Sequence, residues 1–278
     1  MKKTSLLLFL ILSTSVICAQ TDYTRLSVIY NEHYLAYEED DSLSLDIKRL
    51  DIGDYSSYYW SQVLYWNSLH LRGKNPYVIG GKYRVDNVFK NMPKKGIITF
   101  KHMPFHLTTQ DSIQQLFDWQ LMEGDSVVCS YPCKKAQTTF RGRTWTVWYS
   151  LDLPYSDGPW KLCGLPGLIL HARDNEGKFI FNCVGIEKGD GHSFSYPASE
   201  RVYVSPERLE ELLIFEAYDE EGFRKYFDPS LVGFKAYDKN GRLISNIHWT
   251  AVPYEVFPQN HKKKPATKKP ATEKRRRR

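Results

Sequence analysis

Few residues in this sequence have types and spacing that suit chemistry, and the segment 102–106 holds the best metal-like group. Its His102, Met103 and His106 offer imidazole and thioether ligands of the kind that copper accepts. Pro104 prevents a helix from bringing the two histidines to one face, so a loop would have to place them. We therefore interpret the segment as an ordinary loop or strand end, and we predict neither a metal site nor a cofactor.

Enzyme signatures are sparse elsewhere. The sequence contains no Gly-x-Ser-x-Gly elbow, phosphate loop, dinucleotide fingerprint or zinc motif. Three carboxylates could pair as acid and base, but each lies beside a turn, where aspartate is common: Asp152, Asp157 and Asp174. Arg141 and Arg143 could bind a carboxylate or phosphate, or could brace their hairpin against Asp152 or Glu176, and we prefer the second interpretation. We predict no catalytic residue and lean against an enzyme.

Four cysteines remain beyond the N-terminal segment, and their number is compatible with two disulfides. Four cysteines allow three pairings, among which the sequence does not choose. The spacing of Cys129 and Cys133 resembles half of a metal site only loosely, because no second Cys or His pair complements it. We favour disulfides or free buried thiols over metal for all four: Cys129, Cys133, Cys163 and Cys183.

Residues 1–19 have the organisation of a signal peptide. A basic start precedes an apolar run over residues 6–12, and a plausible cleavage site lies before Gln20. The run is too short to span a bilayer comfortably, so we expect cleavage and export to the periplasm or the outer membrane. Cys18 raises the alternative of a lipid anchor, which the bulky Ile17 before it disfavours.

The net charge of +6 comes from the C-terminal end. Residues 262–278 hold ten of the 38 basic residues and one of the 32 acidic residues, so the rest of the chain is mildly acidic. A segment so rich in Lys, Arg and Pro cannot bury apolar surface, and we expect residues 261–278 to be disordered. Such a tail is either merely solvated or attaches to anionic lipid or polysaccharide. Because the chain carries a signal peptide, we expect no nucleic acid as partner.

The remaining chain predicts mainly β structure in a single domain over residues 20–260. In residues 43–48, Leu43, Leu45 and Ile47 alternate with polar residues, the period of a strand with one wet face. We expect a single antiparallel, curved sheet or partial barrel with a few short helices, and α+β remains possible. Strands are predicted at 25–30, 42–47, 77–79, 83–89, 97–102, 117–121, 126–131, 136–140, 144–151, 168–173, 179–186, 202–204, 234–237 and 243–249. Helices are predicted at 58–71 and 206–218, the second capped by Ser205. A turn is predicted at 123–125 and a three-residue hairpin loop at 141–143.

The segment 160–170 organises this arrangement as a tight turn between two apolar runs. Pro166 presets φ for the second turn position, and Gly167 is expected to supply the positive φ of a type II turn. Gly164 lets the chain approach before the turn, and Leu168 begins a strand. We therefore expect Gly167→Val to impair folding.

An ordered series of short motifs over residues 119–186 resembles the GLPGLI family of exported envelope proteins from Gram-negative bacteria. The series contains the segments 131–136, 140–143, 148–149, 158–161 and 164–169. The resemblance implies an exported, β-rich envelope protein and carries over no activity or catalytic residue. The basic tail, Cys129, Cys163 and Cys183 depart from the family pattern. We interpret the motif positions as structural: Arg141, Gly142, Arg143, Trp148, Tyr149, Gly158, Pro159, Trp160, Gly164, Leu165, Pro166, Gly167, Leu168 and Ile169.

Three functional classes fit these observations. The favoured one is a non-enzymatic binding or structural module that contacts an envelope partner, and a filled core with a surface patch would support it. The second is a carrier of a lipophilic ligand, which needs an apolar cavity near the tryptophans of the curved sheet. The third is an exported hydrolase or metal-dependent enzyme, which needs converging Asp, His and Arg side chains.

Overall fold

The computed structural model describes residues 21–63, 86–102, 106–114, 116–197, 201–219, 222–223, 226, 236–237, 243–244 and 251–257. Several predictions lie outside these residues: the signal peptide, the strand at 77–79, Met103 and the basic tail.

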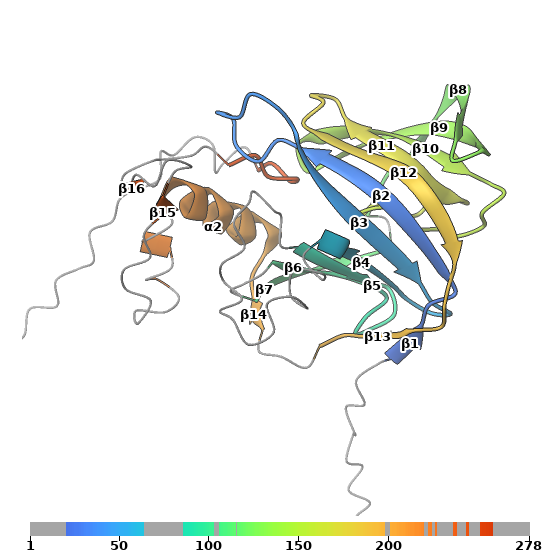
Figure 1. Cartoon of the computed structure of the whole chain (residues 1–278), viewed down its shortest axis with the longest axis horizontal. Helices are drawn as coiled ribbons and strands as arrows, with labels where there is room; N and C mark the ends of the chain where they lie inside the picture. Colours follow the sequence, from blue (N-terminus) through green and yellow to red (C-terminus); the bar gives the residue numbers. More distant parts are fainter. Residues whose placement is uncertain are drawn as a thin grey trace, which may run out of the picture.

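One large curved sheet dominates the described chain (Figure 1). It has 12 strands in the order β14-β7-β6-β5-β4-β3-β2-β12-β11-β10-β9-β8, and its two end strands do not pair with each other. All neighbours are antiparallel except β14 and β7, which run parallel. The mainly β prediction is therefore confirmed, with one parallel pair added. The strands are β2 (Leu26–Tyr34), β3 (Ser44–Ile52), β4 (Ser57–Ser61), β5 (Asp86–Lys90), β6 (Ile97–His102), β7 (Leu107–Ser112), β8 (Gln120–Val128), β9 (Tyr131–Phe140), β10 (Arg143–Ser150), β11 (Leu168–Asp174), β12 (Phe179–Lys188) and β14 (Val202–Tyr203).

Two small sheets and one long helix complete the described elements. β1 (Thr21–Tyr23) pairs with β13 (Ser193–Ser195), and β15 (Ala236–Tyr237) pairs with β16 (Leu243–Ile244). The helix α2 (Pro206–Tyr218) contacts β7 near one end of the large sheet. No helix among the described residues combines the length and apolar character needed to cross a membrane.

The inner face of the large sheet forms a filled aromatic core. Along β10, Trp145, Val147 and Tyr149 are buried and the residues between them less so, as the alternation predicts. The Trp145 ring lies 5.4 Å from that of Trp160, and the Tyr254 ring lies 5.1 Å from Trp160 on a stacked geometry. Aromatic side chains therefore occupy the interior of the curve.

The orientation of β3 is opposite to the one that its apolar alternation predicts. Leu45 is 49% exposed, whereas Asp46 and Lys48 are buried. Leu50, further along the same strand, faces the core and sets which residues point inward, because side chains alternate strictly. The buried charges are compensated by an ion pair of 3.1 Å between Lys48 and Asp46.

The helix predicted at 58–71 begins as a strand. Tyr58–Ser61 belong to β4, and residues 64–85 lie outside the described residues. The two tyrosines face opposite sides of the sheet: Tyr59 is buried in the core, and Tyr58 stacks on Phe89 at 4.4 Å. Aromatic packing on both faces stabilises the extended conformation here.

Two turns of the structure also differ from those predicted from the sequence. The turn predicted at 123–125 is a β-bulge within β8, where the register with β9 shifts between Met122 and Asp125. The true turn follows at Cys129 and Ser130, both with positive φ. The hairpin loop predicted over 141–143 has two residues, Arg141 and Gly142, with φ of 43° and 80°. Two positive φ values are typical of a type I′ hairpin turn.

Gly167 is required because two backbone segments approach each other closely at this residue. The prediction of a positive φ at Gly167 is wrong. In this segment the positive φ values belong to Trp160 and Gly164. A Cβ atom on Gly167 would lie 2.1 Å from the backbone oxygen of Ser150. The start of β11 therefore lies so close to the end of β10 that a side chain at position 167 would overlap the backbone.

The helix α2 is anchored to the sheet by His102 at the end of β6. Ser205 caps the helix by accepting a hydrogen bond of 3.2 Å from the Arg208 amide, as predicted. The His102 ring contacts Asp86 at 2.7 Å through Nδ1 and Glu216 of α2 at 3.3 Å through Nε2. Burial alone would lower the pKa of His102, but these two carboxylates outweigh it and raise the pKa to about 10.

Replacing Gly167 with alanine tests whether close approach requires this glycine. We expect Gly167→Ala to lower the free energy of unfolding by about 3 kcal/mol, because the methyl group overlaps the Ser150 carbonyl. Gly185→Ala is the matched control, since its Cβ would meet Ile29 at an ordinary 3.5 Å, and we expect a loss below about 1 kcal/mol. Urea denaturation measures both, and equal midpoints would contradict the prediction.

The raised pKa of His102 makes stability depend on pH. The folded protein holds this proton more tightly than the unfolded chain, whose pKa is 6.5. The stabilisation is therefore complete below pH 6.5 and is lost as the pH rises towards about 10. We expect the urea midpoint to fall across this range, and to fall less in His102→Gln. A parallel decline in both proteins would show that other groups cause it.

Candidate functional site

Four charged residues from distant parts of the chain meet in a buried cluster, which we call the charge quartet: Asp111, Arg141, Lys161 and Glu255. Lys161 Nζ lies 2.8 Å from Asp111 Oδ2 and 2.5 Å from Glu255 Oε1. Arg141 bonds the same two carboxylates, reaching Glu255 at 2.7 Å. Two cations thus balance two anions, and the Lys161 side chain is only 2% exposed.

The quartet joins four segments of the fold. Asp111 belongs to β7, Arg141 to the β9–β10 turn, Lys161 to the β10–β11 connection, and Glu255 to the C-terminal described segment. Burial would raise the pKa of Asp111, but Lys161 and Arg141 hold it below its usual value. Its buried ion pairs therefore hold the four segments together.

Arg143 braces its hairpin separately. Its guanidinium lies 2.8 Å from Asp174 and 3.6 Å from Glu176, and it also donates to the Pro253 carbonyl at 2.8 Å. Glu176, one of the two acids expected to pair with these arginines, is thus a minor partner. Asp174 is the closer one, and Arg141 takes its partners from the charge quartet.

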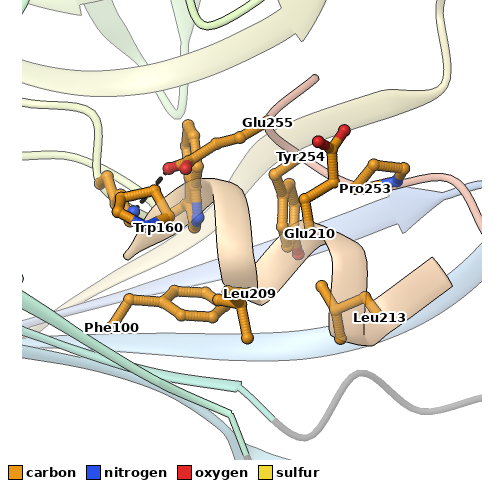
Figure 2. Close-up of a pocket in the computed structure, with 10 residues that line it drawn as sticks. Phe100, Trp160, Leu209, Glu210, Leu213, Pro253, Tyr254 and Glu255 are labelled. Carbon is orange, nitrogen blue, oxygen red and sulfur yellow. Dashed lines mark hydrogen bonds and ion pairs between the residues drawn. The ribbon is translucent and has the colours of Figure 1, made fainter. Parts of the chain in front are cut away.

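A small crevice lies beside the quartet, between α2 and the C-terminal segment (Figure 2). Its volume is about 30 Å³, which holds one or two water molecules. A lipid needs several hundred Å³. The crevice is therefore a packing defect between elements. Its lining comprises Phe100, Trp160, Lys161, Pro206, Leu209, Glu210, Leu213, Pro253, Tyr254 and Glu255.

The other motif positions have structural surroundings. Lys90 donates to the carbonyls of Gly158 at 2.6 Å and Leu162 at 3.1 Å, which fixes the segment leading into the motif. Trp119 donates to the Cys163 carbonyl at 2.8 Å. Five motif residues have side chains within the core: Tyr149, Trp160, Leu165, Leu168 and Ile169. Trp148 differs, because it lies on the outer face of the sheet and is half-buried.

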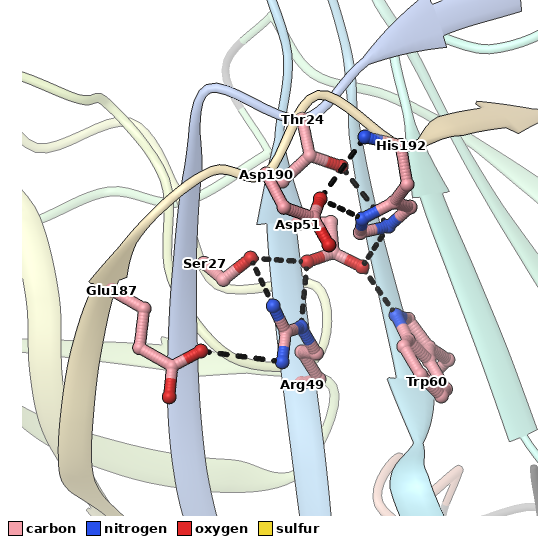
Figure 3. A network of polar contacts seen from close by, with 8 residues as sticks. All are labelled: Thr24, Ser27, Arg49, Asp51, Trp60, Glu187, Asp190 and His192. Atoms are coloured by element: carbon pink, nitrogen blue, oxygen red, sulfur yellow. Dashed lines mark hydrogen bonds and ion pairs between the residues drawn. The ribbon is translucent and has the colours of Figure 1, made fainter.

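A second polar network lies on the outer face around Asp51 (Figure 3). Asp51 accepts hydrogen bonds from Ser27 at 2.6 Å, Arg49 at 2.9 Å and Trp60 at 2.7 Å, and it contacts His192 at 3.3 Å. The Ser27 hydroxyl donates to the carboxylate and not to the histidine, so the histidine cannot activate it as a nucleophile. The network holds the segment that contains His192 on the sheet.

The outer face also carries a row of aligned side chains across five strands. Lys135 lies opposite Trp148, Trp148 opposite His171, His171 opposite Asn182, and Asn182 opposite Asn31. A parallel row places Gln137, Thr146 and Arg173 opposite one another. We call these residues the Trp148 surface: Asn31, Lys135, Gln137, Thr146, Trp148, His171, Arg173 and Asn182.

Positive charge surrounds Trp148. Lys135 Nζ lies 5.7 Å and Arg173 Cζ 5.8 Å from the ring centroid, both within the range of cation–π attraction. The His171 ring is 5.0 Å away, edge to face, and contacts Asn182 at 3.3 Å. Burial lowers the pKa of His171, so this ring is neutral at pH 7. The alternation of residues along β10 is enough to predict from sequence that Trp148 lies on this face. The alignment of side chains across five strands cannot be predicted in this way, because no short stretch of sequence contains it.

The candidate metal ligands and the cysteines do not come together as a metal site in the described part of the chain. No group of three or more His, Cys, Asp or Glu among the described residues could hold a metal ion. Both ring nitrogens of His102 contact carboxylates, and His106 adopts a positive φ at the start of the next described segment. All four cysteines are free thiols: Cys133, Cys163 and Cys183 are buried, and Cys129 is half-buried.

Removing the Lys161 charge tests whether the quartet stabilises the fold. We expect Lys161→Met to lower the free energy of unfolding by about 3–5 kcal/mol, because two carboxylates lose a buried partner. Arg25→Met is the matched control, since the Arg25–Asp54 pair is exposed and its loss should leave the urea midpoint unchanged. Adding Glu255→Gln to Lys161→Met should restore part of the loss, and no restoration would argue for packing instead of charge.

A protein-family model described as "Protein of unknown function (Porph_ging)" matches residues 110–171. The matched span contains Asp111, Arg141 and Lys161, three members of the charge quartet. The resemblance to the GLPGLI family stays a prediction. No curated protein matches the sequence.

Among solved structures, two crystal forms of PNGF-II are similar to this chain, with TM-scores of 0.44 and 0.46 and identities of 15% and 14%. They cover 71% and 72% of this chain but 34% of PNGF-II. MucB in complex with MucA(peri) matches with a TM-score of 0.28 and 12% identity, over 64% of this chain and 52% of MucB. The chain thus spans about a third to a half of these proteins, and the similarities assign it neither activity nor partner.

Proposed function

We propose that this chain is a non-enzymatic, exported binding module of the cell envelope that binds an acidic polysaccharide on the Trp148 surface. The observation that carries the proposal is the cross-strand row in which Lys135, Trp148, His171 and Asn182 are directly opposite one another. The predicted signal peptide would bring the chain to the envelope, where such polymers are exposed.

The side chains of the row suit the groups of an acidic sugar chain. The half-buried indole of Trp148 offers a flat apolar surface for the C–H face of a sugar ring. Arg173 and Lys135 can pair with carboxylate or sulfate groups, Arg173 in a bidentate manner. The amides of Asn31 and Asn182 both donate and accept, as bonds to sugar hydroxyls require.

The geometry of the row fits an extended polymer. Neighbouring strands lie about 4.8 Å apart, so a row across five strands extends about 19 Å. Because the strands are held by backbone hydrogen bonds, the side chains are already arranged before a ligand arrives. Preorganisation of this kind lowers the entropic cost of binding.

The interior of the fold supports a surface function. The fully buried side chains include Trp145, Trp160, Phe179 and Phe181, which fill the concave side where a carrier would need its cavity. The crevice beside α2 is far too small for a lipid. The carboxylate of Asp51 already contacts four side chains, so it is not available as the base of a hydrolase.

Binding to polygalacturonate, a uronic acid polymer, tests the proposal, with neutral dextran as the ligand control. We expect the mature protein to bind polygalacturonate in a salt-sensitive manner and to ignore dextran. Trp148→Ala and Arg173→Ala should each weaken binding about tenfold, because each removes a contact of about 1.4 kcal/mol. Affinity electrophoresis or titration calorimetry measures the loss.

Matched controls separate the Trp148 surface from the basic tail. Tyr55→Ala removes an aromatic side chain that is 76% exposed elsewhere, and Arg25→Ala removes an exposed cation, so both should bind as the unaltered protein does. Equal affinity of Trp148→Ala and the unaltered protein would place any binding outside the Trp148 surface and overturn the proposed site. Absence of binding to polygalacturonate, with the fold intact, would count against an acidic sugar ligand.

A further inference from the structure

Two cysteines far apart in the sequence meet where the β8–β9 turn reaches β12. Cys129 lies in the turn with φ of 49°, and Cys183 lies in β12 with its side chain towards the core. The Cys129 thiol donates to the Cys183 carbonyl at 3.0 Å across a sequence separation of 54 residues. The pKa of the Cys183 thiol is raised, first by its burial and then by a hydrogen bond with the Cys129 thiol. The two side chains are therefore in contact.

The contact depends on the curvature of the sheet. Strands β8 and β12 are separated by β9, β10 and β11 in the sheet order, so they are not neighbours through backbone pairing. The turn reaches β12 only because the sheet bends. A covalent bond at this point would fix the bend and attach the β8–β9 hairpin, whose β8 side chains are almost all exposed.

We propose that Cys129 and Cys183 form a redox-sensitive disulfide when the chain meets a disulfide oxidant. This inference does not depend on the proposed polysaccharide function. It selects one pairing among the three that the four cysteines allow.

The partial exposure of Cys129 makes it the thiol that reacts first. Its thiolate attacks one sulfur of a small disulfide such as glutathione disulfide, forming a mixed disulfide and releasing one glutathione thiolate. Cys183 then loses its proton and attacks the Cys129 sulfur, which forms the Cys129–Cys183 bond and releases the second glutathione. Two protein thiols are oxidised, one oxidant disulfide is reduced, and the two protons pass to the glutathione thiolates.

Cys133 is the competing partner, and its position explains why it is passed over. Its thiol donates to the Tyr131 carbonyl at 3.4 Å within its own strand, and it is 2% exposed. Burial raises the pKa of Cys133 and Cys163 as it does that of Cys183, so contact with Cys129, and not acidity, selects Cys183 as the partner. Cys163 lies in the motif segment, beside the Trp119 ring.

The experiment starts from the mature protein, purified under reduction, and exposes it to glutathione disulfide. Free thiols are then alkylated, and trypsin is used to cut after Lys101, Lys134, Lys178 and Lys188. We expect mass spectrometry to show the peptide 102–134 linked to the peptide 179–188, with the thiol count falling from four to two. Closing a loop of this length should raise the melting temperature by about 5–10 °C.

The peptide 102–134 contains both Cys129 and Cys133, so variants assign the bond. Cys133→Ser should keep the link and the rise in melting temperature, whereas Cys129→Ser should lose both. Under reduction, Cys129→Ser should have the same melting temperature as the unaltered protein, which would show that the substitution leaves the fold intact. A link that persists in Cys129→Ser, a link to Cys163, or four free thiols after oxidation would each overturn the proposal.

Discussion

The structure depends on a balanced set of charges buried where four segments meet. Lys161 and Arg141 lie between Asp111 and Glu255, and each charge contacts two of the opposite sign. Burying a charge costs several kcal/mol, so any displacement that separates one member leaves another uncompensated. The arrangement therefore specifies one relative position for β7, the β9–β10 turn, the motif segment and the C-terminal segment, beyond what apolar packing alone would select.

This constraint determines what the concave side of the sheet can do. Holding Lys161 in place also holds the adjacent Trp160, whose ring lies between Trp145 and Tyr254 at 5.4 and 5.1 Å. Holding Glu255 likewise brings in Tyr254, which donates its hydroxyl to the buried carboxylate of Glu32. The interior is thus filled by its own aromatic side chains, which is why the proposed binding surface lies on the outside of the sheet.

Features with local causes could be predicted from the sequence, and features with distant causes could not. The alternation along β10 and the Ser205 cap are properties of a few consecutive residues. The sequence did not predict β4, because Tyr58 and Trp60 begin an apolar series up to Leu69 whose spacing suits a helix. The charge quartet has partners 30 to 114 residues apart, so no window of sequence contains it. The inward orientation of Asp46 likewise depends on a partner from another strand, Ser61 of β4, which donates a hydrogen bond of 2.9 Å to its carboxylate.

The difference between the inner and outer faces of the sheet is clearest along β10. Trp145, Val147 and Tyr149 point into the core, and Thr146 and Trp148 point outward, so one strand contributes to both stability and the Trp148 surface. A register shift between Trp148 and Tyr149 adapts this strand to β11 where the motif approaches most closely. The inner side chains of this strand are buried in the core, whereas Thr146 and Trp148 are only half-buried. Trp148, half-buried between two cations, is the outward residue of this strand on which the proposed recognition depends.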